Sequence, residues 1–303
     1  MRTHARTGSL AIAASIVLAL LTGCATAVPA SDDGELRVVA STNVYGGLAE
    51  AIGGDHVTVT SIVSDPSQDP HSFEGNVQVQ LALSKADVVI ENGGGYDDFV
   101  DRLLAGVDNQ GVAVLNAVQL SGLKVDEQFN EHVWYDLPSV AAVVDAVRDE
   151  FVRIDPDHAD FFIQNAGKLT RGLADLKGRQ AEAKAKYAGL PVAVTEPLPL
   201  YLLAACGLDN KTPAAFSAAI ESGTGVTPGV MQETLDLVGD QAVKLVVYNA
   251  QTAGPETERV LAEAKSAGVP TIAVTETVPA GQDYLSWMDG ILTGIEDALG
   301  GRS

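Results

Sequence analysis

A proline-free stretch of about thirty residues near the middle of the chain constrains its fold more than any other feature. Residues 157–186 are rich in Ala, Leu, Lys, Arg, Glu and Gln. Apolar side chains recur there at helical spacing, at Phe162, Leu169, Leu173 and Leu176. Asp155 with Pro156 suits the start of a helix, and Gly189 with Pro191 suits its end. A helix of this length extends roughly 45 Å, which predicts a stiff connection between two parts of the molecule.

Short β-branched apolar runs alternate with helix-like segments on both sides of this helix. On the N-terminal side we expect strands at 36–41, 57–63, 87–91 and 112–115 and helices at 77–85 and 96–104. On the C-terminal side we expect strands at 192–195, 243–248 and 271–275 and helices at 198–205, 213–221, 255–267 and 284–299. This alternation predicts an α/β fold of two lobes, each a mostly parallel sheet flanked by helices, joined by one long rigid helix.

The N-terminus has the layout of a secretory signal. Arg2 and Arg6 precede an apolar run that ends in Leu21-Thr22-Gly23-Cys24, and this run is shorter than the roughly 20 residues of a membrane-spanning helix. The last four residues resemble the lipobox of bacterial lipoproteins, in which Cys24 is lipidated; a secreted protein cleaved near residues 25–27 is the alternative. We therefore expect a signal peptide at 1–23, a tether at 24–35, an N-terminal lobe at 36–155, the linking helix at 156–188 and a C-terminal lobe at 189–303.

The charge of the chain argues against one class of partner. Its 40 acidic and 19 basic residues give a formal net charge of −21. Nucleic acid binding depends on Lys and Arg that neutralise phosphates, so nucleic acid is excluded as a partner. Cys206, the second cysteine, has apolar neighbours in sequence and is interpreted as a buried, inert thiol.

Two histidines occupy loop-like segments that also contain acids. His71 lies in Asp69-Pro70-His71-Ser72-Phe73-Glu74, and His132 lies in Glu131-His132-Val133-Trp134-Tyr135-Asp136. Imidazole is the commonest protein metal ligand, and nearby carboxylates orient it. The other histidines, His4, His56 and His158, fit a ligand role less well, because they fall in the signal, in a turn and in the first turn of the long helix.

Two glutamates end predicted strands of the second half. The string Ala-Val-Thr-Glu occurs at 193–196 and again at 273–276, so that Glu196 and Glu276 each follow a buried run. Ligands bind beyond the carboxyl ends of strands in open parallel sheets, although a glutamate there is also common as a helix-start residue. Together with two histidines these acids form a possible four-ligand set for Zn2+, and bidentate carboxylates would suit Mn2+.

The order of several short motifs resembles the zinc- or manganese-binding substrate-binding lipoproteins of bacterial ABC transporters (cluster A-I, solute-binding protein family 9). The motifs are Ala40-Ser41-Thr42, Ile52-Gly53-Gly54-Asp55, Asp69-Pro70-His71-Ser72-Phe73-Glu74, Ala86-Asp87-Val88-Val89, His132-Val133-Trp134 and Asp155-Pro156. The resemblance implies that His71, His132, Glu196 and Glu276 hold the metal. It departs at Glu276, where the family usually has aspartate, and in the segment 122–131, which lacks the histidines of many zinc members.

The resemblance implies a function without a chemical step. A monomer anchored through Cys24 to the outer face of the cell membrane would bind Zn2+ or Mn2+ as transported cargo and deliver it to an ABC transporter permease. Trp134, Asp136, Asn249 and Gln251 are candidates for lining the site. Two alternatives remain: a surface adhesion lipoprotein and, from another class, a zinc hydrolase, which would need an open metal position for water. The chain carries no HExxH, GxSxG or P-loop motif.

Overall fold

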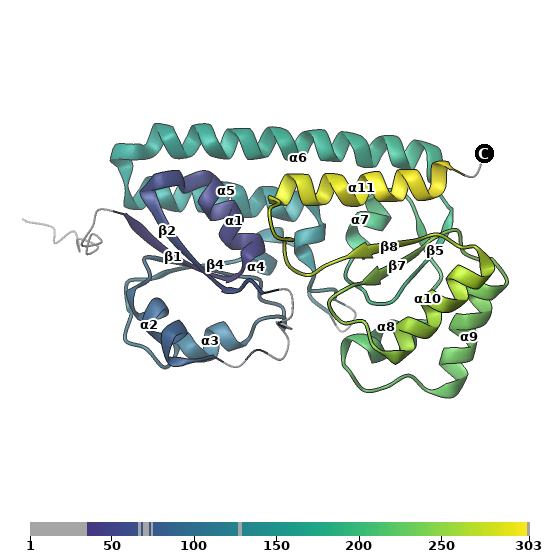
Figure 1. The fold of residues 1–303 in the computed structure, drawn as a ribbon. Coiled ribbons are helices and arrows are strands. Elements are labelled where there is room, and N and C mark those ends of the chain that lie inside the picture. Colours follow the sequence, from purple (N-terminus) through teal and green to yellow (C-terminus); the bar gives the residue numbers. More distant parts are fainter. Residues whose placement is uncertain (1–34, 66–67, 69–72, 74, 127–128, 302–303) are drawn as a thin grey trace, which may run out of the picture.

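The first half of the chain forms a parallel four-stranded sheet in the order β2-β1-β3-β4 (Figure 1). The computed structural model describes residues 35–65, 68, 73, 75–126 and 129–301. The strands are β1 (Leu36–Thr42), β2 (Val57–Val63), β3 (Val88–Glu91) and β4 (Ala113–Asn116). Val38 of β1 pairs with both Val59 of β2 and Val88 of β3, and β3 also pairs with β4, so β1 and β3 are the central strands. Their aliphatic side chains are buried on both faces, as is typical of parallel sheets.

Helices cover both faces of this sheet. They are α1 (Asn43–Gly53), α2 (Val77–Lys85), α3 (Phe99–Leu104), α4 (Ala117–Ser121) and α5 (Leu137–Ile154). Successive strand residues serve opposite faces: Val88 belongs to the core shared with α1 and α5, and Val89 to the core shared with α2 and α3. In Figure 1, α1 and α5 lie on one side of the sheet and α2 and α3 on the other.

The second half repeats this architecture. Its parallel sheet has the order β6-β5-β7-β8, with β5 (Pro191–Val194), β6 (Asp209–Asn210), β7 (Val246–Asn249) and β8 (Thr271–Val274). Its helices are α7 (Leu200–Ala205), α8 (Ala214–Glu221), α9 (Pro228–Gly239), α10 (Pro255–Ala267) and α11 (Tyr284–Gly300). Residues of α8, α9 and α10 pack with β5 and β7 into a separate core. The expected α/β fold with two mostly parallel sheets is confirmed.

The two sheets are joined by α6 (Ala159–Tyr187), a helix of 29 residues. It lies along the same side of both sheets, above α5 and α11 (Figure 1). Its buried side chains, including Leu173 and Leu176, belong to one core that also contains residues of both sheets. The helix begins slightly later than expected: Asp155 is the C-cap of α5, a 3-10 turn (Pro156–His158) follows, and His158 is the N-cap of α6.

Two further expectations concern single features. Cys206 is fully buried, and burial raises the pKa of its thiol to about 12, in agreement with an inert role. Within the described part of the chain, no helix combines the length and apolar character needed to cross a membrane. Cys24 lies outside the described residues.

Candidate metal-binding site

The repeated Ala-Val-Thr-Glu strings lie on the two strands that flank β7. The first string ends β5 and the second ends β8, and the sheet order places β7 between them. Val194 pairs with Val247, and Asn249 pairs with Val274. The strands are parallel, so Glu196 and Glu276 follow them at the same carboxyl edge of the sheet, beside the last residue of β7.

That last residue, Asn249, connects the two glutamates. Its Nδ2 donates one hydrogen bond to Glu196 Oε2 at 2.7 Å and another to Glu276 Oε1 at 2.9 Å. Both carboxylates are almost fully buried, with 3% and 2% of the residue surface exposed. The repeated string therefore brings two buried acids together around one neutral amide group.

Each glutamate also accepts a hydrogen bond from a hydroxyl group. Thr252 Oγ1 donates to Glu196 Oε1, and Tyr96 donates to Glu276 Oε2 at 3.0 Å. Tyr96 belongs to the first half of the chain, so its bond joins the two halves at the site. Burial, followed by the charge of Glu276, raises the pKa of Tyr96 well above its ordinary value, and the phenol therefore remains a donor.

The imidazole of His132 reaches the same region from the loop that precedes η3 (Val133–Tyr135). Its side chain is buried, and its ring lies 5.9 Å from that of Tyr96, measured between centroids. Nδ1 lies 2.7 Å from Asn130 Oδ1, while Asn130 Nδ2 donates to Pro197 O at 3.0 Å. An amide oxygen only accepts, so Nδ1 carries a proton, and in the neutral imidazole Nε2 presents its lone pair. A metal-binding imidazole is commonly oriented in this way.

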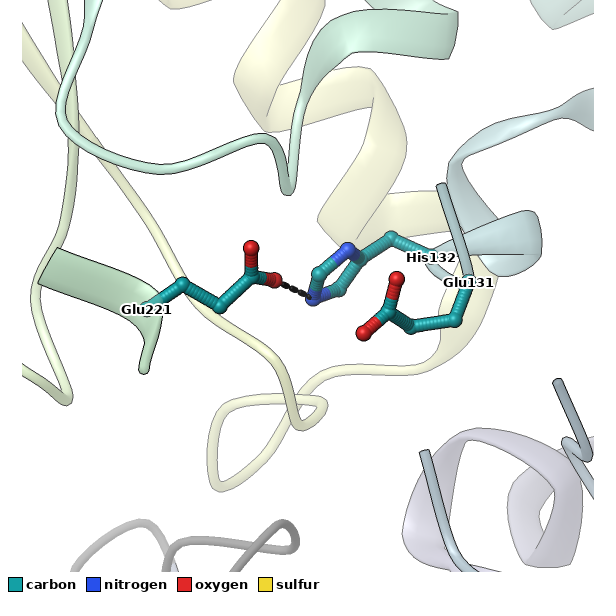
Figure 2. A group of neighbouring side chains, drawn as sticks. All are labelled: Glu131, His132 and Glu221. Carbon is teal, nitrogen blue, oxygen red and sulfur yellow. Dashed lines mark ion pairs between the residues drawn. The ribbon is translucent and has the colours of Figure 1, made fainter. Parts of the chain in front are cut away.

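Two more carboxylates face this lone pair (Figure 2). One ligand atom from each of Glu131, His132 and Glu221 lies within 4.8 Å of the others. Glu221 Oε1 is 3.6 Å from His132 Nε2, and this oxygen is buried without a hydrogen-bond partner among the described residues. The side chains approach from different halves of the chain, since Glu131 and His132 share a loop while Glu221 is the last residue of α8.

Glu221 interacts electrostatically with the buried carboxylates of Glu196 and Glu276. Burial is the largest cause that raises the pKa of Glu221, to about 8, and the charges of Glu131, Glu196 and Glu276 raise it further. All four acids therefore lie close enough to interact. The result is a cluster of two buried and two half-buried carboxylates around one buried imidazole, which is a set of nitrogen and oxygen donors suited to a divalent metal.

The sequence-based candidates fall into three groups. His132, Glu196 and Glu276 converge on this cluster, whereas His71 lies outside the described residues. Asn249 and Gln251 support the cluster: Gln251 Oε1 accepts hydrogen bonds from the backbone N–H groups of Glu276 at 2.5 Å and Thr277 at 3.2 Å. Trp134 packs its ring against His132, with centroids 5.0 Å apart. Asp136 instead caps α5 by accepting from Ser139 N.

Glu221 was not predicted from the sequence, although one signal was present. A helix has partial negative charge at its C-terminal end, so an acid is disfavoured there. Glu221 nevertheless ends α8. An acidic residue at that position, in a segment that is otherwise apolar, indicates a role in binding rather than in stabilising the helix.

Fold and site together define a two-lobed binding protein with an acidic, imidazole-containing centre. Residues 38–298 match the family model described as ZnuA, zinc-uptake complex component A, periplasmic. The chain therefore belongs to this family, and the resemblance inferred from the sequence motifs is confirmed.

Individual relatives agree with this assignment. The chain is 34% identical over 161 residues to the manganese-binding lipoprotein MntA of Bacillus subtilis and 32% identical over 166 residues to that of Halalkalibacterium halodurans. These matches cover 50% and 54% of this chain, and the chain spans about half the length of both relatives, 52% and 55%. A solved crystal structure of ZnuA has the same fold, with a TM-score of 0.72 at 19% identity over 88% of this chain and 99% of that one.

Proposed function

We propose that this chain captures a divalent transition metal, zinc or manganese, outside the cytoplasm and delivers it to the permease of an ABC importer. The observation that carries the proposal is the convergence of Glu196, Glu276 and His132 in a buried site. Buried carboxylates are unfavourable without a compensating cation. Among the residues that the structure describes, neither Glu196 nor Glu221 forms an ion pair with a lysine or arginine. A divalent metal would supply the missing positive charge.

The proposed ligands are His71, His132, Glu196 and Glu276. Imidazole nitrogen binds Zn2+ at about 2.0–2.1 Å and carboxylate oxygen at about 2.0–2.2 Å, so the set is chemically adequate. Most N/O sites bind Zn2+ more tightly than Mn2+, and selectivity then depends on geometry and supply. The family model refers to zinc uptake and the MntA relatives to manganese, which supports both metals as candidate cargo.

Calorimetric titration tests this function. The chain without residues 1–24 is stripped of metal and titrated with Zn2+ and Mn2+, beside the variants Glu276→Ala and Glu233→Ala. We expect tight one-to-one binding that Glu276→Ala weakens by at least about tenfold, the scale on which even outer-shell partners act. Glu233 is exposed on α9, so its variant controls for the loss of one negative charge. If neither metal binds tightly, the metal-delivery function is wrong.

We further propose that a lipid on Cys24 anchors the protein to the outer face of the cell membrane. The support is the lipobox-like string before Cys24 and the lipoprotein names of the two MntA relatives. When the full chain is expressed in a bacterium, we expect it in the membrane fraction and expect Cys24→Ala to move it to the soluble fraction. Unchanged membrane association of Cys24→Ala would contradict the anchor.

A further inference from the structure

Glu221 has a position that helix stability does not explain. It ends α8, where the helix dipole disfavours a negative charge, and its Oε1 is buried without a hydrogen-bond partner among the described residues. The side chain points at the imidazole of His132 (Figure 2). A cation bound between this carboxylate and the ring would stabilise it.

The distances fit a shared metal ion. Two donor atoms that bind one ion at about 2.1–2.2 Å lie about 3.0 Å apart at the right angle of octahedral geometry. They lie about 3.5–3.7 Å apart at the tetrahedral angle or at the 120° equatorial angle of five-coordinate geometry. Glu221 Oε1 and His132 Nε2 are separated by 3.6 Å. Because Asn130 holds the proton on Nδ1, the lone pair of Nε2 faces the same space as the unpartnered oxygen.

We propose that Glu221 is an additional ligand of the cargo metal and favours a coordination number above four. This inference rests on the proposed function and extends it. With Glu221, the described residues of the proposed site offer one imidazole and three carboxylates, and carboxylates that bind through both oxygens raise the coordination number above four. Structural Zn2+ sites are almost always tetrahedral, whereas Mn2+ accepts six ligands and prefers oxygen. Glu221 is therefore a residue that shifts selectivity from Zn2+ toward Mn2+.

Substitution of Glu221 tests its contribution to selectivity. The chain without residues 1–24 is titrated with Mn2+ and with Zn2+, beside Glu221→Gln, Glu221→Ala and the exposed-acid control Glu233→Gln. We expect both Glu221 variants to lose at least tenfold in Mn2+ affinity and less than threefold in Zn2+ affinity, with the control unchanged. Equal affinities in parent and variants would overturn the proposal. A gain in affinity would also overturn it, because Glu221 would then compete with the metal for His132.

The visible spectrum of bound Co2+ reports coordination directly. Tetrahedral Co2+ absorbs intensely, whereas five- and six-coordinate Co2+ absorbs weakly. We expect a weak spectrum for the parent chain and an intense one for Glu221→Ala. Glu131→Gln removes one negative charge from the same group of side chains, so it distinguishes the effect of charge on affinity from the effect of losing a metal ligand. This variant should bind Co2+ more weakly and give the same spectrum as the parent chain. Identical spectra for the parent and Glu221→Ala would exclude Glu221 as a ligand.

The experiment separates this inference from the proposed function. If the parent chain binds none of Mn2+, Zn2+ and Co2+, the metal-delivery function itself fails and the inference fails with it. If the parent binds metal and the Glu221 variants behave identically, only the inference fails. Glu221 makes no hydrogen bond through the oxygen in question, so its variants are expected to keep the circular dichroism spectrum and thermal stability of the parent.

Discussion

At the scale of the residue, Asn249 is a neutral side chain that lies between two buried acids. Its single amide nitrogen donates to two buried carboxylates from neighbouring strands. An amide stabilises such a pair by hydrogen bonding but adds no positive charge, so repulsion between the acids is only partly offset. Asn249 therefore keeps the two proposed ligands in place before a metal arrives.

Asn249→Ala should consequently affect the metal-free protein more than the loaded one. Loss of the shared donor leaves two buried acceptors unsatisfied, and we expect the free energy of unfolding to fall by about 1–3 kcal/mol without metal. With saturating Mn2+ the metal would satisfy the carboxylates, and the difference should shrink. Chemical denaturation of parent and variant under both conditions measures this. An equal loss with and without Mn2+ would contradict this role of Asn249.

Part of the site was predictable because its signals are local. The repeated string identified Glu196 and Glu276, and a histidine beside acids identified His132. Glu221 could not be found in this way, because its role depends on the approach of α8 to a loop about 90 residues earlier in the chain. Tyr96 was missed for the same reason. Residues that meet only because segments distant in sequence pack together form no motif of fixed spacing in the sequence.

At the scale of the element, α6 stabilises both halves at once. Leu173 is buried in the core that extends across both sheets, whereas Lys177, four residues later, is exposed. Arg179 adds hydrogen bonds from α6 to Asp289 and Glu296 of α11. One face of this helix therefore links the stability of the two halves.

Leu173→Ala should lower the stability of the whole molecule rather than of one half. Truncation of a buried leucine reduces the free energy of unfolding by about 2–5 kcal/mol. We expect one denaturation transition at a lower midpoint, measured by circular dichroism and by tryptophan fluorescence. The control Lys177→Ala should change the free energy by no more than about 0.5 kcal/mol. Two separated transitions would show that the halves unfold independently.

Many elements were predictable from hydrophobic pattern, but three helices of more than ten residues were not: α1, α5 and α9. β2, α2 and α10 have the bounds expected from the sequence. The longest of the three is the 18-residue helix α5. Its core positions are mostly valines, including Val143, Val144 and Val147, and β-branched residues weaken a helix signal. Packing against α4 and α6 overrides this preference, which is a tertiary effect absent from local pattern.

At the scale of the whole molecule, the halves are joined by more than α6. Asn43 of α1 exchanges two hydrogen bonds with the backbone of Val278, at 2.9 and 3.0 Å. Tyr135 donates to Thr275 O, and Tyr284 donates to Trp134 O. Trp134, Thr275 and Val278 lie within two residues of His132 or Glu276 in sequence, so the geometry of these proposed ligands depends on the spacing of the two halves.

The side-chain amide of Asn130 is one link through which the spacing of the halves affects the site. Its oxygen fixes the proton on His132, and its nitrogen is bonded to Pro197, the neighbour of Glu196. The planar amide of Asn130 therefore connects the imidazole of His132 in the first half to the backbone of Pro197 in the second half. If the two halves moved slightly apart, Asn130 would follow Pro197 and its hydrogen bond with His132 Nδ1 would break. The imidazole would then lose the orientation that suits it to a metal. In the proposed delivery, a permease that separates the two halves would thereby release the metal without contacting it.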